Sequence, residues 1–306
     1  MFEIIKEAPS SFYLEEERND YVVSSKMKHV WAIQIDLVQK LLQVCEKHNI
    51  KVLASGGTML GAVRHGGMIP WDDDIDMMMY REDYNRLCEV AKDEFIHPYF
   101  FQTEYTDPGA LRGHAQLRNS QTTAILRSEN KGYKFNQGIF IDIFPLDAVI
   151  DDEKLFMKQY KDSQKYRLLA SRLSTLSYRY CKNVDGGFKN KIVNILHPVA
   201  NFIIRKFKLE QKAYAKFEKI CQRYNNVDTK MVSTLVLEFT TRRHFKYRKD
   251  YENIIYVPFE YIQLPIGSEY DHALTQEYGD YMKMVKGTSV HGEIIFDVEK
   301  SYKEYI

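Results

Sequence analysis

The chain has 306 residues, of which 44% are hydrophobic and 28% charged, and its formal net charge is +1. This composition excludes a disordered chain, and the near-zero net charge points to no particular partner. Four scattered cysteines without CxxC spacing favour a reducing compartment over a disulfide framework or a zinc site. The acidic N-terminus lacks the apolar run of a signal peptide, and no segment is apolar enough to cross a membrane. We therefore expect a cytoplasmic protein.

The first clear pattern follows an acidic segment, residues 1–23, in which no helix or strand stands out. From Ser24 to His48, apolar residues recur at helical spacing with lysines and glutamines between them, which predicts an amphipathic helix. Lys51–Ala54 then predicts a short strand, and Thr58–His65 predicts a second helix. The strand and the second helix meet at a glycine-rich turn.

That turn, Ser55-Gly56-Gly57-Thr58, is a candidate phosphate site. Amides freed by glycine at a helix start can approach phosphate oxygens, and Thr58 adds a hydroxyl. Arg64, on the predicted helix, can neutralise charge on a phosphoryl group. The alternative is an ordinary strand-to-helix loop, because two adjacent glycines are weak evidence by themselves.

Four aspartates follow within five positions: Asp72, Asp73, Asp74 and Asp76. Apolar residues alternate with the last two, which places Asp74 and Asp76 on one face of a strand. Two carboxylates so placed can share one Mg²⁺ or Mn²⁺, because hard cations prefer oxygen ligands. A solvated acidic turn, or a helix cap at Asp83 before a helix to residue 92, is the alternative, but neither needs the alternation. With the glycine turn, the aspartates predict a metal-assisted reaction on a phosphorylated substrate.

Two later segments add candidate residues. The polar stretch LRGHAQLRNSQTTAI holds Arg112 and Arg118, and an arginine there can clamp a phosphate, although exposed arginines are usually solvated. In GIFIDIFPLDAVI, Asp142 interrupts an apolar run, and a carboxylate in a buried strand is costly unless it is paired or binds a cation. We expect it to join the same metal site; a hydrogen bond to a neighbouring loop is the alternative. Asp147, after Pro145, is expected to serve a turn or a helix cap.

Residues 151–224 differ from the rest because they hold 17 Lys and Arg against seven Asp and Glu. Their pattern predicts helices separated by Asp185-Gly186-Gly187. Basic helices with apolar faces suit an anionic membrane surface or an anionic acceptor, and a helical subdomain with a solvated basic face is the alternative. Nucleic acid is not expected as a partner, since no binding motif accompanies the charge.

The last part of the chain, residues 225–306, alternates short apolar segments with turns. Tyr256–Glu260 and Leu264–Gly267 predict edge strands or ordered loops, and a short helix is expected from about Glu269 to Tyr281. His291 is a candidate site residue, although an isolated histidine is more often structural.

These elements together resemble a known family. A strand, a glycine turn, a helix, an Asp-x-Asp strand and a third aspartate on a later strand resemble the nucleotidyltransferase fold. More specifically, SGGTMLGAVRHGGMIPWDDDID followed by GIFIDIFPLD resembles the LicD family of bacterial phosphocholine transferases, fukutin and fukutin-related protein. Similar segments extend this resemblance from Ile33 to His291. The chain departs from the family at Met68, where an aromatic is usual, and after YGDYM, where it reads KMVKG and the family usually has a proline.

The resemblance implies an α/β (α+β) fold, with a nucleotidyltransferase-like mixed sheet flanked by helices and a basic helical insertion. It divides the chain into an N-terminal lead-in (1–23), a catalytic core (24–150), the basic helical subdomain (151–224) and a C-terminal part that completes the core and acceptor site (225–306).

The resemblance also implies an enzyme that moves a phospho-alcohol unit from a CDP-activated donor to a hydroxyl of a cell-surface glycan or lipid-linked precursor, releasing CMP. Phosphocholine is the leading candidate, and a polyol such as ribitol stays open. Asp74, Asp76 and Asp142 would hold one or two Mg²⁺ ions on the diphosphate, and Asp142 could also accept the proton of the attacking hydroxyl. Asp72 and Asp73 would orient the strand or bind a second ion.

Two other functions stay open. One is nucleotidyl transfer, in which the same carboxylates pass NMP from an NTP to a small acceptor. The other is a non-catalytic accessory protein that binds a nucleotide or glycan. For the transferase, the basic region 151–224 would bring a cytoplasmic protein to the inner face of a membrane.

Overall fold

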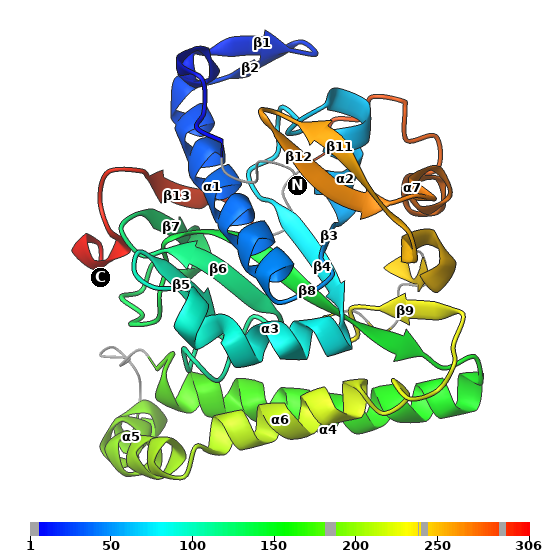
Figure 1. The fold of residues 1–306 in the computed structure, drawn as a ribbon. Helices are drawn as coiled ribbons and strands as arrows, with labels where there is room; N and C mark the ends of the chain where they lie inside the picture. The colour runs from blue at the N-terminus through cyan, green and yellow to red at the C-terminus, as the bar shows by residue number, and fades with distance from the viewer. Residues whose placement is uncertain (1–5, 181–187, 238, 240–243, 288–291) are drawn as a thin grey trace.

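The computed structural model describes residues 6–180, 188–237, 239, 244–287 and 292–306, and it shows a mixed sheet flanked by helices (Figure 1). The helices are α1 (Ser25–Lys47), α2 (Gly56–His65), α3 (Arg81–Glu94), α4 (Glu153–Ser177), α5 (Phe188–Lys206), α6 (Leu209–Cys221) and α7 (Tyr270–Tyr278). The strands are β1 (Glu16–Arg18), β2 (Tyr21–Val23), β3 (Leu53–Ala54), β4 (Asp76–Tyr80), β5 (Tyr99–Gln102), β6 (Ala115–Asn119), β7 (Thr123–Leu126), β8 (Ile139–Val149), β9 (Met231–Ser233), β10 (Lys246–Tyr247), β11 (Ile254–Phe259), β12 (Ile262–Gly267) and β13 (Ile294–Asp297). This architecture confirms the predicted fold class.

Strand β8 is the centre of the main sheet. It pairs in parallel with β4 on one side, and antiparallel with β6 and then β9 on the other. The sheet order is β10-β9-β8-β4-β3, with β5 pairing to β6. The parallel register places Asp76 directly opposite Asp142. Two candidate residues that lie far apart in the sequence thus become neighbours.

The core lies where α1 packs against the sheet and the β11–β12 hairpin. Trp31 and Ile35 of α1 are fully buried, as are the apolar residues of β4, Met77 and Met79. Helix α1 spans almost the range that its periodicity predicted, and Ser24 caps it by accepting a hydrogen bond from the Met27 amide at 3.3 Å. This packing fixes the strand that follows the aspartates.

Two element starts differ from the sequence predictions. Helix α2 begins at Gly56, two residues earlier than predicted, so Gly56 and Gly57 form its first turn. Helix α3 begins at Arg81, and Asp83 lies inside its first turn, so the predicted cap at Asp83 is wrong. Acidic residues in a first turn stabilise the helix dipole, which explains its presence there.

The N-terminal segment holds more structure than the sequence indicated. A short 3₁₀ turn at Ser10–Tyr13 precedes the hairpin β1–β2. Its turn residues Asn19 and Asp20 have φ of 53° and 57°, the left-handed values that tight hairpins require. Strands of three residues are too short to show an alternating pattern, which is why no strand was predicted there.

The prediction that Asp147 serves a turn or helix cap is wrong, because β8 continues through it to Val149. Pro145 is tolerated there, because pairing with β6 ends at Ile143 and pairing with β9 begins only at Asp147. The Asp147 carboxylate is fully buried, and Arg81 donates to its two oxygens at 2.8 and 2.7 Å. Asp147 therefore joins α3 to the sheet.

The basic region forms a helical layer beneath the sheet. In Figure 1, α4 and α6 run side by side below α3, with α5 at one end of the pair. A second cluster of buried residues joins this layer to β8; its members include Val149, Phe156, Tyr214 and Phe217. The predicted breaker at 185–187 lies outside the described residues, and the four-part division of the chain stays a prediction. The described residues include no helix that is both long and apolar enough to cross a membrane.

The C-terminal elements agree with the sequence predictions. The two predicted edge strands form the hairpin β11–β12, and the predicted short helix is α7. Glu260, at the hairpin turn, binds Arg18 at 2.5 and 2.9 Å and accepts the Met68 amide at 3.0 Å. The hairpin therefore ties the N-terminal segment to the loop that leads into the aspartates.

Candidate active site

Three of the predicted metal ligands converge at the edge of the β4–β8 pair. Asp76 begins β4, Asp142 lies opposite it on β8, and Asp74 precedes β4 by two residues. One carboxylate oxygen from each lies within 4.8 Å of the others. The structure thus brings together the residues that alternation and burial singled out, and their role as metal ligands stays a prediction.

Electrostatics at this cluster favour a cation. Burial, together with the charges of Asp74 and Asp142, holds the pKa of Asp76 well above its ordinary value. Burial and the Asp74 charge raise the pKa of Asp72 to about 8. Crowded carboxylates make one another's ionisation costly, and a divalent cation between them removes that cost. An all-oxygen donor set of this kind fits Mg²⁺ or Mn²⁺.

The loop of aspartates is held in place by α1. The indole nitrogen of Trp31 donates to the Asp72 carbonyl at 3.2 Å, and the Gln34 amide donates to the Asp73 carbonyl at 2.8 Å. Both helix side chains are buried. The loop's main-chain carbonyls therefore carry these anchoring bonds. Asp72, Asp73 and Asp74 also form a second group of carboxylates with oxygens within 4.8 Å, as a second ion would need.

Two residues that the sequence analysis left without a role orient Asp142. Gln116 donates to Asp142 Oδ1 at 2.6 Å, and His114 Nε2 lies 2.9 Å from the same oxygen. Although burial alone would raise the pKa of Asp142, His114 and Gln116 hold it below its ordinary value. These two residues are identified by the antiparallel register of β6 and β8, which sets Gln116 opposite Asp142.

The structure does not place Arg118 or Arg112 as phosphate clamps. Arg118 is only 1% exposed, and burial lowers its pKa to about 9. Its guanidinium donates to Gln102 Oε1 at 2.7 Å, to the Gly138 carbonyl at 2.6 Å, and to Gln116 Oε1. Arg118 therefore supports Asp142 through Gln116. Arg112 is paired with a glutamate, Glu129, at 3.1 Å.

The glycine turn is divided between the cleft and the interior. Gly57 lines the cleft, and a Cβ there would lie 2.9 Å from Asp72 Oδ2. A Cβ on Gly56, whose φ is +51°, would lie 3.5 Å from Asp76 Oδ2. Ser55 and Thr58 are buried, and Thr58 Oγ1 accepts the Asp76 amide at 2.8 Å. Thr58 thus ties α2 to β4, and the glycines let the helix start approach the carboxylates.

The aspartates open into a cavity of about 840 Å³. Arg64 lies on its wall and donates to the Tyr281 and Lys283 carbonyls at 2.8 and 3.2 Å. Arg64 and Asp76 therefore line the same cavity. The lining also includes Leu60, Ile69, Trp71, His114, Phe144, Leu237, Tyr278, Asp280, Val285 and Gly287.

Helix α7 and β10 supply a group of residues that the sequence analysis did not select. Glu277 pairs with Lys246 at 3.1 Å, and both side chains are nearly buried. Although burial opposes it, the Lys246 ammonium holds the pKa of Glu277 at about 2. Tyr278 lines the cleft, and burial together with the nearby Glu277 and Asp76 charges raises its pKa. His291, also predicted as a site residue, lies outside the described residues.

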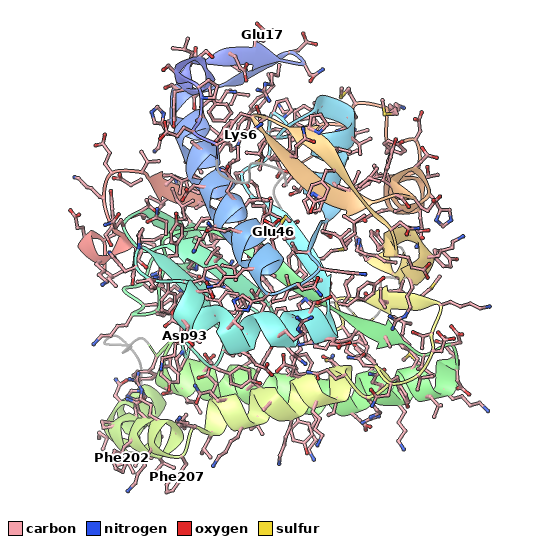
Figure 2. The ribbon with its side chains drawn as sticks, in the orientation of Figure 1. Lys6, Glu17, Glu46, Asp93, Phe202 and Phe207 are labelled. Atoms are coloured by element: carbon pink, nitrogen blue, oxygen red, sulfur yellow. The ribbon has the colours of Figure 1, made fainter. Side chains whose placement is uncertain are left out.

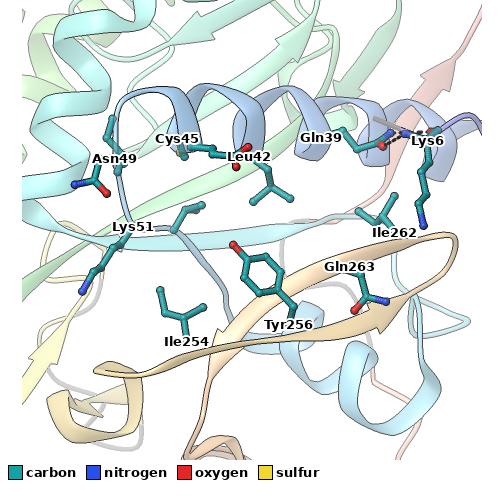
Figure 3. A pocket seen from close by; sticks show the side chains of 13 residues that line it. Lys6, Gln39, Leu42, Cys45, Asn49, Lys51, Ile254, Tyr256, Ile262 and Gln263 are labelled. Atoms are coloured by element: carbon teal, nitrogen blue, oxygen red, sulfur yellow. Dashed lines mark hydrogen bonds between the residues drawn. The ribbon is translucent and has the colours of Figure 1, made fainter. Parts of the chain in front are cut away.

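A smaller cavity of about 360 Å³ lies between α1 and the β11–β12 hairpin (Figure 3). Leu42, Ile254 and Ile262 line it, and Gln39 exchanges two hydrogen bonds with the Lys6 backbone at its rim. Its described lining holds one carboxylate and no pair, so it lacks the groups that phosphoryl chemistry needs. The cavity that holds the aspartates is therefore the candidate active site.

Comparison with known proteins gives concordant matches. Residues 49–182 match the model of the LicD/FKTN/FKRP nucleotidyltransferase domain. The chain is 31% identical over 242 residues to the lipopolysaccharide cholinephosphotransferase LicD of Haemophilus influenzae, covering 79% of this chain and 85% of that protein. It is also 46% identical over 49 residues to the human ribitol 5-phosphate transferase FKRP, covering 16% of this chain and 10% of that protein. The chain is therefore a member of the LicD family of enzymes that transfer phosphorus-containing groups.

Proposed function

We propose that this enzyme moves a phospho-alcohol unit, with phosphocholine as the leading candidate, from a CDP-activated donor to a glycan hydroxyl and releases CMP. The observation that carries the proposal is the convergence of Asp74, Asp76 and Asp142 at a cleft beside the start of α2. The long match to a cholinephosphotransferase supports this choice of donor alcohol. The shorter match to a ribitol 5-phosphate transferase keeps a polyol as the second choice.

The three aspartates fit a divalent cation, because their oxygens lie within 4.8 Å and the pKa of Asp76 is raised by its neighbours. Asp74, Asp76 and Asp142 would hold Mg²⁺ or Mn²⁺, which when bound neutralises charge on a diphosphate. Asp72 and Asp73 lie beside them and are proposed to orient the loop or to hold a second ion.

The chain's own residues would then bind and orient the donor. Gly57, in the first turn of α2, and Arg64 both line the cleft, so the helix start and the guanidinium would receive phosphate oxygens there. Asp142 would accept the proton of the attacking hydroxyl, with His114 and Gln116 fixing the orientation of its carboxylate. Trp71, Phe144 and the two tyrosines of the wall would exclude water from the transfer.

The acceptor is proposed to be a cell-surface glycan or its lipid-linked precursor, in lipopolysaccharide, teichoic acid or capsule. The enzyme would meet a lipid-linked precursor at the inner face of the membrane and would work there as a peripheral protein. The H. influenzae relative is a lipopolysaccharide cholinephosphotransferase, which supports this class of acceptor.

The test is incubation of the purified protein with CDP-choline, Mg²⁺ and candidate glycans, followed by measurement of CMP. We expect CMP release that a chelator abolishes and that Asp74→Ala and Asp76→Ala each lower by at least about a thousandfold. Asp93→Ala is the matched control, since Asp93 is exposed and lies on α3 (Figure 2). Activity that survives both cleft substitutions would remove these residues from the mechanism.

The same assay separates the remaining alternatives. Parallel reactions with CDP-ribitol, CDP-glycerol and CDP-ethanolamine identify the alcohol. In nucleotidyl transfer, a label on the base of an NTP would end on the acceptor instead of in free CMP. Binding of a CDP-alcohol without turnover across a broad acceptor panel would support a non-catalytic accessory role.

A further inference from the structure

Helix α5 turns its polar side toward the rest of the protein. The Ser177 hydroxyl donates to Asn201 Oδ1 at 2.7 Å, and the Tyr180 hydroxyl donates to Asn194 Oδ1. The His197 ring stacks on Tyr180 with centroids 3.7 Å apart. The side of α5 that contacts α4 and the segment after it therefore carries two amides and an imidazole, together with one buried apolar residue, Ile204.

The opposite side of α5 is apolar and open. Phe202 is 62% exposed and Ile195 is 73% exposed, and Figure 2 shows Phe202 and Phe207 at the outer edge of the molecule. Spacings of three and four residues place these side chains on one side of the helix. This outer face of α5 consists of Ile195, Leu196, Val199, Phe202, Ile203 and Phe207, all at least 43% exposed.

This arrangement is the reverse of that in an ordinary surface helix, which buries its apolar stripe and shows polar residues to water. A contiguous apolar patch left in water is costly, and in a stable protein it marks a contact with an apolar partner. The contacts of the inner side show that α5 is not simply rotated out of place. The outer face of α5 is thus a contact surface.

Charge around this face selects the partner. Residues 188–209 contain lysines and arginines but no aspartate or glutamate. Lys206 is exposed, and its ammonium lies 5.3 Å from the ring centre of Phe202 and 5.9 Å from that of Phe207. A lysine stem that lies along aromatic rings with its charge at the rim is the arrangement of a side chain at a lipid interface.

We propose that the outer face of α5 binds an anionic lipid bilayer, with the helix lying in the plane of the headgroups. Phe202, Phe207 and their aliphatic neighbours would enter the acyl boundary, while Lys206 and Lys208 would contact lipid phosphates. A second copy of the chain fits less well, because it would bring two basic faces together. Lipid binding itself is independent of the proposed reaction; its use, to reach a lipid-linked acceptor, rests on that proposal.

Vesicle flotation tests the apolar part of the contact. The protein should float with phosphatidylcholine vesicles that contain about one third phosphatidylglycerol, and much less with phosphatidylcholine alone. Phe202→Ser combined with Phe207→Ser should weaken this binding by at least about tenfold. Leu14→Ser combined with Ile96→Ser is the matched control and should bind as wild type, because Leu14 and Ile96 are at least as exposed as Phe202 and Phe207 but lie elsewhere. If the double variant Phe202→Ser, Phe207→Ser bound these vesicles as tightly as the wild type, the proposal would be overturned.

The same assay tests the charged part. Lys206→Gln combined with Lys208→Gln should weaken binding to anionic vesicles by about thirtyfold, because each lysine near such a surface contributes about 1 kcal/mol and about 1.4 kcal/mol is a factor of ten. High salt should weaken the wild type more than this variant. Binding of wild type that is indifferent to phosphatidylglycerol would refute the charge argument. The choice of a bilayer would be refuted if the wild type bound no lipid but formed a dimer in sedimentation equilibrium, and if the double variant Phe202→Ser, Phe207→Ser were a monomer.

A second readout places the helix at the bilayer directly. Phe202→Trp should be quenched by brominated lipids, whereas Ile96→Trp should not; the native Trp31 is buried and Trp71 lines the cleft. Thermal unfolding checks that each variant is folded. With a water-soluble acceptor, the double variant Phe202→Ser, Phe207→Ser should release CMP at the same rate as the wild type. Lipid binding with no CMP release would therefore count against the proposed reaction alone. Equal quenching of Phe202→Trp and Ile96→Trp would refute the proposal that the outer face of α5 is the part that binds the bilayer.

Discussion

Replacing Asp76 by asparagine is expected to stabilise the metal-free protein while it abolishes activity. Asparagine keeps the shape of the Asp76 side chain but lacks the negative charge that the Asp74 and Asp142 carboxylates oppose. At 4.8 Å and an effective dielectric constant of about 20, each carboxylate pair repels by about 3 kcal/mol. Proton uptake already relieves part of this repulsion, so the expected gain is about 1–3 kcal/mol in the free energy of unfolding.

The gain should depend on pH with a definite sign. The pKa of Asp76 in the folded protein is raised above its ordinary value of 3.8, so ionisation costs stability as the pH rises above that value. The advantage of Asp76→Asn, measured by urea unfolding in chelator, should therefore be small near pH 4 and grow toward pH 8. Asp72, whose pKa is about 8, should show the same sign when replaced by asparagine.

Added Mg²⁺ should reverse the order of stability. A cation that binds only the folded wild type stabilises it by mass action, whereas the variant lacks one of the three ligands and should gain little. The matched control is Asp93→Asn, an exposed carboxylate on α3, which should behave as wild type with and without Mg²⁺. A variant that is less stable than wild type in chelator at pH 8, or that gains equally from Mg²⁺, would refute the reasoning.

Three further predictions concern the surroundings of the aspartates. Arg81→Met should lower the free energy of unfolding by about 3–5 kcal/mol, measured with urea, because it leaves the buried Asp147 carboxylate unpaired; an unchanged midpoint would contradict this. His114→Ala should lower the rate of CMP release about 10–100-fold without unfolding the protein, because Asp142 loses an orienting partner; full activity would show that Gln116 suffices. Gly57→Ala should raise the KM for the donor, because the new Cβ would lie 2.9 Å from a loop carboxylate oxygen; an unchanged KM would mean that the loop yields without effect.

The predicted part of the site is the part that local patterns encode. Alternation with apolar residues places Asp74 and Asp76 on one side of the chain whatever the tertiary structure, because side chains of a strand alternate. Asp142 stands out because a lone carboxylate in an apolar run needs a partner, and the structure supplies it across the β4–β8 pair. The fold class followed from the same segments through the family they resemble.

The missed part depends on register and burial, which one strand does not reveal. His114 and Gln116 matter because β6 pairs antiparallel with β8 at a specific register, and Tyr278 reaches the cleft from a helix far along the chain. Arg118 was misread because a buried arginine and a solvated one look alike in sequence. Asp147 was misread because a proline two residues earlier suggested that the strand had ended, whereas Pro145 lies at a change of pairing partner.

The way the aspartate loop is anchored separates its shape from its chemistry. Trp31 and Gln34 hold the loop by its backbone carbonyls, so these bonds are indifferent to which side chains the loop carries. Replacing the metal-ligating side chains of the loop should then leave the path of its backbone unchanged. The side chains of this loop can therefore be exchanged while its backbone stays anchored. Histidine, asparagine or glutamate at its positions would change which cation the site prefers, without a change in the fold.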